Sequence, residues 1–337
     1  MSKKHFTNEK DNRPNLYKIA FFVVLILLVT IMALGYNGIL PREARKNALM
    51  QKNDYSFLNP SVRMVEKENL LVNFEPLRSS LKAKYEIRDD YMISLYFEYL
   101  PTGANITLNR DERIWPASLI KIPVAMAAMK KVETGLWKFS NELVILDEDK
   151  DSEYGDLYKQ PTGTTLTIEQ LLKETLINSD NTAHFVLLRN LDGSDLEDVY
   201  THLGLEEVIS ALKLTPKDGE VDNRMTAKNY SVFFRSLFNA TYFSPQYSQQ
   251  FMDILQYAPK EYLGQGVPSE VPFVHKTGIR VEDRVKADSG IVYVKNRPYL
   301  ITVMIQKKAI EPIPEGEVEE IFRDISKEIY DYVSKAN

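Results

Sequence analysis

Three short motifs rich in nucleophilic and basic residues stand in order along this chain. They are Ser118-Leu119-Ile120-Lys121, Ser179-Asp180-Asn181 and Lys276-Thr277-Gly278. A serine hydroxyl attacks an amide poorly unless a base removes its proton. If Ser118 begins a helix, Lys121 lies one turn later on the same face, where a lysine of lowered pKa can act as that base. The pattern indicates acyl transfer through a covalent serine ester.

None of the three motifs is specific by itself. The S-x-x-K spacing recurs at Ser79–Lys82 and Ser210–Lys213, and an isolated example is better explained as a helix cap with a solvated lysine. The S-D-N motif could likewise cap a helix, and the K-T-G motif could be a strand followed by a turn. However, S-D-N and K-T-G each occur once, 61 and 158 residues after Ser118. It is the ordered set that indicates chemistry.

The ordered set resembles that of the serine β-lactamases and penicillin-binding proteins, the class A β-lactamases above all. The resemblance runs from about Asn69 to the C-terminus and covers the whole expected globular domain. It implies that Ser118 is the nucleophile and that Lys121 is its general base. It also implies that Ser179 passes a proton to the leaving nitrogen and that Asp180 is a buried structural carboxylate.

The resemblance also assigns the groups that bind substrate. These substrate-binding residues are Asn181, Thr277, Gly278 and Ile279. The amides of Ser118 and Ile279 would form the oxyanion hole, in which backbone N–H groups stabilise developing negative charge. Asn181 would hold the lysine base and the substrate amide. Lys276 and Thr277 would receive the substrate carboxylate, and the charge of Lys276 would help to lower the pKa of the base.

One departure from class A concerns the acid that hydrolyses the acyl-enzyme. Those enzymes use a glutamate between the second and third motifs, and aligning Gly204 with the family glycine places it near Leu214. No acid and no E-x-x-L-N sequence occurs there. The nearest acids are Glu206, Glu207 and Glu220, each several residues out of place, and we interpret them as solvated loop charges. Without a deacylating base, the covalent intermediate should turn over slowly.

Three functions follow from this combination. The first is a serine acyl hydrolase of the class A β-lactamase-like family that is acylated by β-lactams and hydrolyses them slowly. The second is a D-alanyl-D-alanine carboxypeptidase or transpeptidase that acts on peptidoglycan stem peptides. The third is a non-catalytic receptor for β-lactams or muropeptides, which is disfavoured because an 18-residue leader leaves no room for a cytoplasmic output domain.

The composition narrows the remaining classes of function. The 337-residue chain has no cysteine, which excludes disulfides, thiolate catalysis and iron–sulfur clusters. Its four histidines show no metal-ligand spacing, so no metal or other cofactor is expected. A net charge of -5 without a basic stripe gives no indication of nucleic acid as a partner. A Ser-His-Asp triad stays formally open, since His184 or His275 could serve.

The N-terminal region predicts a membrane segment. Residues 19–35 are uncharged and strongly apolar, and residues 36–40 could extend them to the length of a span. We therefore expect a leader over 1–18, an anchor over 19–40, a spacer over 41–61 and the hydrolase domain over 62–337. A signal peptide that is cleaved, giving a secreted protein, is the alternative.

The orientation of this anchor is not decided by charge. Five Lys or Arg residues precede the apolar segment and four follow it closely, a thin bias. Peptidoglycan and β-lactams are met outside the cytoplasm, so the resemblance implies a single-pass protein of the bacterial cell membrane with its catalytic domain outside.

The remaining sequence predicts an α+β fold. Strands are expected at Tyr91–Leu100, Asn105–Leu108, Ser289–Val294 and Tyr299–Gln306, and terminal helices at Val62–Lys84 and Glu315–Val333. Residues 118–251 are mostly helical in pattern, with a capping box at Thr167–Gln170. We expect an antiparallel sheet with flanking terminal helices, a mainly helical subdomain, and the site in the crevice between them.

A proline just after the first motif and an acidic run before the second are two further features of the sequence. Pro123 removes the N–H that would bond the carbonyl of Leu119 in a regular helix, which predicts a kink or a tightened first turn. The acidic run Asp147–Asp156 is most simply a solvated loop.

Overall fold

The computed structural model describes residues 21, 23–28, 30, 57, 72–208, 223–314 and 316–335. The chain divides into two compact units, Met1–Asp54 and Tyr55–Asn337. In the first unit, the described residues 21, 23–28 and 30 are helical. No helix within the described residues is long and apolar enough to cross a membrane. Most of the expected anchor 19–40, and the loop around Leu214, lie outside the described residues.

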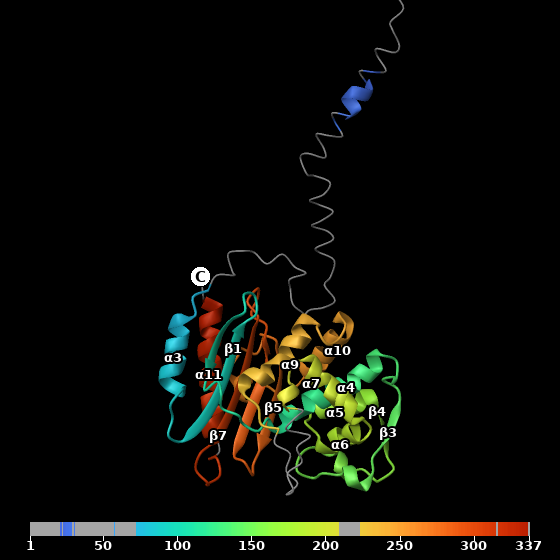
Figure 1. Cartoon of the computed structure of the whole chain (residues 1–337), viewed down its shortest axis with the longest axis vertical. Helices are drawn as coiled ribbons and strands as arrows, with labels where there is room; N and C mark the ends of the chain where they lie inside the picture. The colour runs from blue at the N-terminus through green and yellow to red at the C-terminus, as the bar shows by residue number, and fades with distance from the viewer. Residues whose placement is uncertain are drawn as a thin grey trace, which may run out of the picture. The chain divides into compact units, whose positions relative to one another are not determined.

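Within the described part of the second unit, five strands form one antiparallel sheet (Figure 1). They are β1 (Tyr91–Tyr99), β2 (Ala104–Leu108), β5 (Phe273–Arg280), β6 (Val285–Val292) and β7 (Tyr299–Lys307), in the order β2-β1-β7-β6-β5. Strand β1 pairs with β7 over its whole length, from Tyr91 opposite Lys307 to Tyr99 opposite Tyr299. Segments from both ends of the domain therefore meet in the sheet, and β5, which carries the K-T-G motif, lies at an edge.

The terminal helices α3 (Glu75–Tyr85) and α11 (Glu317–Lys335) pack together against one face of this sheet (Figure 1). In α11 the buried residues recur every three or four positions, which gives the helix one apolar face. They include Val318, Phe322, Ile325 and Ile329, and they share a core with Phe97 and Ile301 of the sheet.

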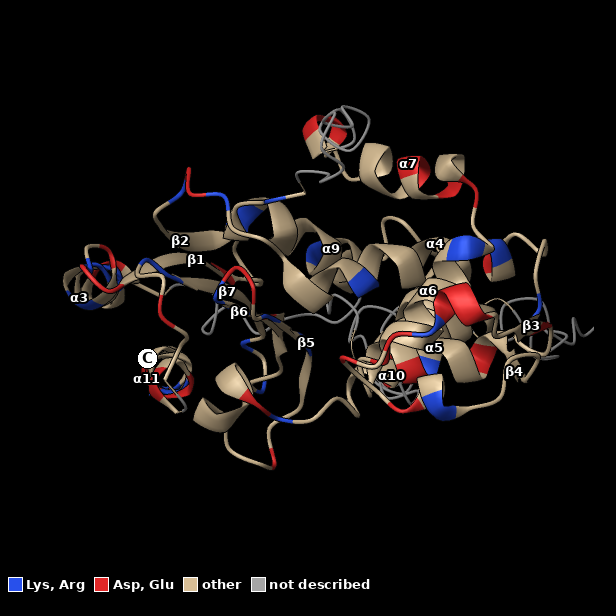
Figure 2. Cartoon of the chain, turned by 90° about the horizontal axis from the view of Figure 1, so that it is seen from below, with Lys and Arg blue, Asp and Glu red and all other residues tan. Residues whose placement is uncertain are grey.

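The other face of the sheet packs against the helical part of the domain. Its helices are α4 (Lys121–Glu133), α5 (Ile168–Leu176), α6 (Asn181–Arg189), α7 (Gly193–His202), α9 (Ala227–Asn239) and α10 (Pro245–Leu255), with a small sheet of β3 (Glu142–Val144) and β4 (Thr165–Thr167). Nearly every residue of α4 is buried, which makes α4 the central helix of this part. Figure 2 shows α4 and α6 close together, and the two helices contact each other.

The predicted fold class is confirmed, and most expected elements are present. The capping box at Thr167–Gln170 begins α5 as predicted. The third strand was misplaced, because β6 begins at Val285 rather than at Ser289. The expected N-terminal helix begins at Glu75 within the described residues, and Pro76 lies in its first turn. Proline is well tolerated there, since the first turn has no internal acceptor for its missing N–H.

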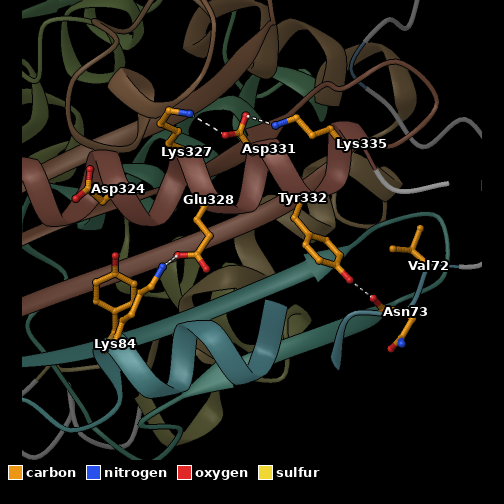
Figure 3. A pocket seen from close by; sticks show the side chains of 10 residues that line it. Val72, Asn73, Lys84, Asp324, Lys327, Glu328, Asp331, Tyr332 and Lys335 are labelled. Atoms are coloured by element: carbon orange, nitrogen blue, oxygen red, sulfur yellow. Dashed lines mark hydrogen bonds and ion pairs between the residues drawn. The ribbon is translucent and has the colours of Figure 1, made fainter. Parts of the chain in front are cut away.

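A large groove of about 890 Å³ runs between α3 and α11 (Figure 3). Its polar side chains bond to one another: Lys84 pairs with Glu328 at 2.8 Å, and Lys327 pairs with Asp331 at 2.7 Å. The Tyr332 hydroxyl donates to the carbonyl of Asn73. None of the residues predicted to act in catalysis lines this groove. We interpret it as the polar interface between the terminal helices.

Phe57, within the expected spacer, is held against the domain. Its ring lies edge-on to Tyr293 with the centroids 5.0 Å apart. Its amide donates to Gln249 Oε1 at 2.9 Å, and its carbonyl accepts from the Tyr293 hydroxyl at 2.6 Å. Phe57, which precedes the expected start of the hydrolase domain at residue 62, therefore packs against that domain.

Candidate active site

The three motifs lie on three separate elements that converge. Ser118 is in a 3-10 turn, Ala117–Ile120, which leads directly into α4, and Lys121 is the first residue of α4. Ser179 precedes α6 by two residues, and Asn181 begins that helix. Lys276 lies on the edge strand β5. Residues separated by up to 158 positions in the sequence therefore meet at one point.

Lys121 is the centre of this cluster. Its Nζ lies 3.4 Å from Ser118 Oγ and 3.2 Å from Ser179 Oγ. It also donates to the carbonyl of Ser179 and to Asn181 Oδ1, both at 2.5 Å. The residue is only 2% exposed. Burial lowers the pKa of Lys121 to about 8, against the opposing charges of Asp180 and Asp151. A lysine with this pKa is partly neutral near pH 7 and can accept a proton.

Lys276 reaches the same serine from the other side. Its Nζ donates to Ser179 Oγ at 2.9 Å and to the carbonyl of Thr277 at 3.1 Å. Burial, followed by the charge of Lys121, lowers the pKa of Lys276 to about 7. Two lysines of lowered pKa therefore contact one serine hydroxyl, and this arrangement can relay a proton.

Asp180 is a structural carboxylate and caps helix α6. Its Oδ1 accepts from the amide of Ala183 at 2.8 Å, and its Oδ2 accepts from the amides of Asp156 and Leu157 at 2.7 and 2.9 Å. Gly155 has φ of 91°, and a Cβ there would lie 2.0 Å from the Asp180 carboxylate. This loop needs glycine at 155 for both reasons.

Asn181 is oriented by the acidic run that precedes it. Its Nδ2 donates to Asp151 Oδ1 at 2.9 Å, which leaves its Oδ1 to accept from Lys121. Another acid of the run, Asp149, is 1% exposed and pairs with Arg189 at 2.8 Å. Interpreting Asp147–Asp156 as a solvated loop was therefore wrong for these acids, because tertiary partners bury or engage them.

The K-T-G strand approaches the nucleophile closely. A Cβ on Gly278 would lie 2.9 Å from the amide nitrogen of Ser118, so glycine allows β5 to pass this near the turn. Thr277 joins the cluster through its carbonyl, which accepts from Lys276. A cavity of about 520 Å³ opens beside these elements, and Ser118, Lys121, Asn181 and Ile279 line it.

Further residues of this cavity were not predicted from the sequence. The acids Glu153 and Glu282 line it, together with Arg280, Phe185 and Leu188. Arg280 lies over the ring of Trp115, 4.5 Å from its centroid. An isolated charged residue such as Glu153 or Arg280 gives no sequence signal for a role in the cavity. Glu282 could have been noticed, because it lies four residues after the K-T-G motif.

Neither candidate histidine forms a Ser-His-Asp triad in the described structure. His184 lines the cavity, but its Nδ1 has no hydrogen-bond partner among the described residues. Burial, then the charges of Lys121 and Lys276, lower its pKa to about 3. His275 is paired with Asp288 at 2.9 Å and is fully buried. It lies on the opposite face of β5 from Lys276, because successive residues of a strand alternate.

The acids considered for deacylation are only partly described. Leu214 and Glu220 lie outside the described residues. Glu207 is exposed, accepts from Asn229 at 2.5 Å and lies 3.7 Å from Arg113. Neither Glu206 nor Glu207 is among the residues that line the cavity.

Comparisons with known proteins support the same fold and family. The profile of the beta-lactamase enzyme family matches residues 77–333. Beta-lactamase VEB-1 of Pseudomonas aeruginosa is 33% identical over 92 residues, which cover 27% of this chain and 31% of that protein, so the match spans about a third of that relative. A mutant of PBP-A, solved as its acyl-enzyme complex with penicillin G, superposes with a TM-score of 0.66 at 22% identity, covering 77% of this chain and 97% of the other. A beta-lactamase from Sphaerobacter thermophilus superposes with a TM-score of 0.67 at 21% identity, covering 78% and 98%. With its family profile matched over most of its length, this chain belongs to the beta-lactamase enzyme family.

Proposed function

We propose that this protein is a membrane-anchored serine acyl hydrolase that β-lactams acylate at Ser118 and that releases the product slowly. The observation that carries the proposal is the buried Nζ of Lys121, in contact with both Ser118 Oγ and Ser179 Oγ. A nucleophile, a base of lowered pKa and a second hydroxyl in mutual contact form the arrangement that covalent acyl transfer needs.

In this proposal acylation proceeds by a balanced proton relay. Neutral Lys121 removes the proton of Ser118, whose Oγ attacks the lactam carbonyl. The amides of Ser118 and Ile279 stabilise the oxyanion. As the carbon–nitrogen bond breaks, Ser179 gives its proton to the leaving nitrogen and regains one from Lys121. Lys276 holds the Ser179 oxygen and, with Thr277, attracts the substrate carboxylate.

A D-alanyl-D-alanine peptidase or transpeptidase is the second candidate. The absence of an acid at Leu214 favours it, since hydrolysis of a penicillin ester needs a group that activates water. The structural likeness to PBP-A, a protein solved in acyl-enzyme form with penicillin G, supports acylation by β-lactams in either case. The 33% identity to a beta-lactamase supports the first candidate.

The proposed location is the outer face of a bacterial membrane. The uncharged apolar residues 19–35 support an anchor, and the substrates of both candidate activities lie outside the cytoplasm.

In the deciding experiment, the full-length protein in detergent is incubated separately with a chromogenic β-lactam and with a D-Ala-D-Ala peptide. Intact-mass spectrometry follows the adduct, and Ser118→Ala is the control. A single adduct with the β-lactam, absent in Ser118→Ala, supports the proposal. Faster release of D-alanine than of hydrolysed β-lactam would favour the peptidase. An adduct that persists in Ser118→Ala would refute the assignment of the nucleophile.

A further inference from the structure

The turn that carries Ser118 is a strained element. Ala117, immediately before the nucleophile, has φ of 51°, in the left-handed region that non-glycine residues rarely occupy. Such a conformation persists only where the surrounding structure holds it in place. Strands β5 and β6 contact this turn, and hydrogen bonds from Tyr230 of α9 and from Met225 hold the same segment of the chain.

Pro123 removes one hydrogen bond that would normally stabilise the start of α4. Because proline has no N–H, residue 123 cannot donate to the carbonyl of Leu119 as it would in a continuing helix. The amide of Lys121 is shared between the carbonyls of Ser118 and Leu119. Leu119 is fully buried, where water does not provide a further donor.

The hydroxyl of Tyr230 on α9 supplies that donor. It donates to the carbonyl of Leu119 at 2.8 Å, and Tyr230 is itself completely buried. Burial raises the pKa of Tyr230 well above its ordinary value, so the hydroxyl keeps its proton and remains a donor. The donor that Pro123 cannot provide to the carbonyl of Leu119 therefore comes from a side chain 111 residues away.

A second contact fixes the other end of the same segment. Ile114 and Met225 form a two-hydrogen-bond bridge, with N···O distances of 2.9 and 3.0 Å. Met225 lies two residues before α9, and Tyr230 lies one turn inside it. Residues 225–230 therefore hold the chain on both sides of Ser118.

We propose that Tyr230 is a positioning residue for the Ser118 nucleophile, acting through the carbonyl of Leu119. This inference rests on the proposed function of the site. Loss of the hydroxyl leaves the buried carbonyl short of a donor, and the strained turn relaxes. Ser118 Oγ then moves relative to Lys121 Nζ, and a displacement of about 1 Å can slow a reaction roughly 10²-fold.

The test compares Tyr230→Phe with the double variant Tyr230→Phe/Pro123→Ala. We expect acylation by penicillin, followed by intact-mass spectrometry, to slow about 10- to 100-fold in Tyr230→Phe. Pro123→Ala restores an N–H one turn after Leu119, and the double variant should recover most of the lost rate. Tyr242→Phe is the matched control, because it removes a buried hydroxyl that donates to Asp198 at 2.9 Å, away from the turn. It should lower the melting temperature similarly and acylate normally.

Three results would overturn the inference: a Tyr230→Phe rate within about two-fold of wild type, no recovery in the double variant, or equal slowing in Tyr242→Phe. If the wild type forms no adduct, the proposed function fails, and crystal structures decide the inference separately. A shift of Ser118 Oγ by more than about 0.5 Å in Tyr230→Phe would support positioning, and an unmoved turn would refute it.

Discussion

Lys121 of α4 and Lys276 of β5 both contact the Oγ of Ser179, at 3.2 and 2.9 Å. Two ammonium groups this close to one oxygen repel each other, and both are buried. Burial lowers the pKa of each lysine, and the charge of Lys121 lowers that of Lys276 further. The same arrangement requires different protonation states, because the proposed base must be neutral and the carboxylate-binding lysine must be charged.

Acylation should therefore have a narrow pH optimum. The rate should rise as Lys121 loses its proton, with a pKa of about 8, and fall as Lys276 loses its own, with a pKa of about 7. The maximum should lie between these values, near pH 7.5. In Lys276→Arg the positive charge persists at all accessible pH values, so the alkaline fall should disappear. Acylation rates from pH 5 to 10 measure this, and an unchanged alkaline limb in Lys276→Arg would assign that limb to another group.

Lys276 should also limit the stability of the fold. Its folded-state pKa of about 7 lies below the ordinary value of 10.5, so the unfolded chain binds more protons between these pH values. The free energy of unfolding should consequently rise with pH across that window. Lys276→Met should abolish acylation, raise the melting temperature at pH 7 by a few degrees and flatten this rise. Denaturation at pH 7 and pH 9 measures this change, and Lys82→Met, at an exposed lysine, is the control. An equal rise of the free energy of unfolding with pH in wild type and Lys276→Met would contradict the prediction.

Lys121 should be essential, whereas the lysine of a stray S-x-x-K spacing should not. Lys121→Ala should slow acylation by about 10² to 10⁴, the usual cost of a lost general base. Lys82 is exposed and lies 3.3 Å from Glu86, so Lys82→Ala should acylate like wild type. Single-turnover kinetics with a penicillin provide the measurement. Acylation of Lys121→Ala within a few-fold of wild type would show that another group activates Ser118.

Deacylation should be slower than acylation. With no acid aligned near Leu214, product should appear in a burst of about one enzyme equivalent, followed by a slow steady state. Stopped-flow measurement with a chromogenic substrate tests this. Rapid turnover without a burst would mean that another group activates water, and Glu153→Gln and Glu282→Gln would then be compared because both acids line the cavity.

The catalytic domain should be accessible from outside the cell. If residues 19–40 anchor the chain, protease added to spheroplasts should degrade the domain while a cytoplasmic marker survives. Full protection of the domain would reverse the orientation. A soluble form that begins near Tyr36 would favour the cleaved signal peptide.

Several features of this protein were determined by the sequence alone. The helical spacing of Ser118 and Lys121, the cap formed by Thr167 and the apolar period of the C-terminal helix all depend on residues within one or two turns. Local spacing of this kind is readable because backbone geometry fixes which neighbours share a face. Strand patterns toward both ends of the domain, with helical patterns between them, then predicted the α+β fold.

Tertiary structure alone decided how these residues act together. The contact of Lys276 with Ser179 joins positions 97 apart, and that of Tyr230 with Leu119 joins positions 111 apart. The pKa of a lysine depends on burial and on charges brought in by other elements, which no local pattern records. For the same reason Asp149 and Asp151 resembled a solvated run in sequence, yet in the fold one is buried against Arg189 and the other orients Asn181.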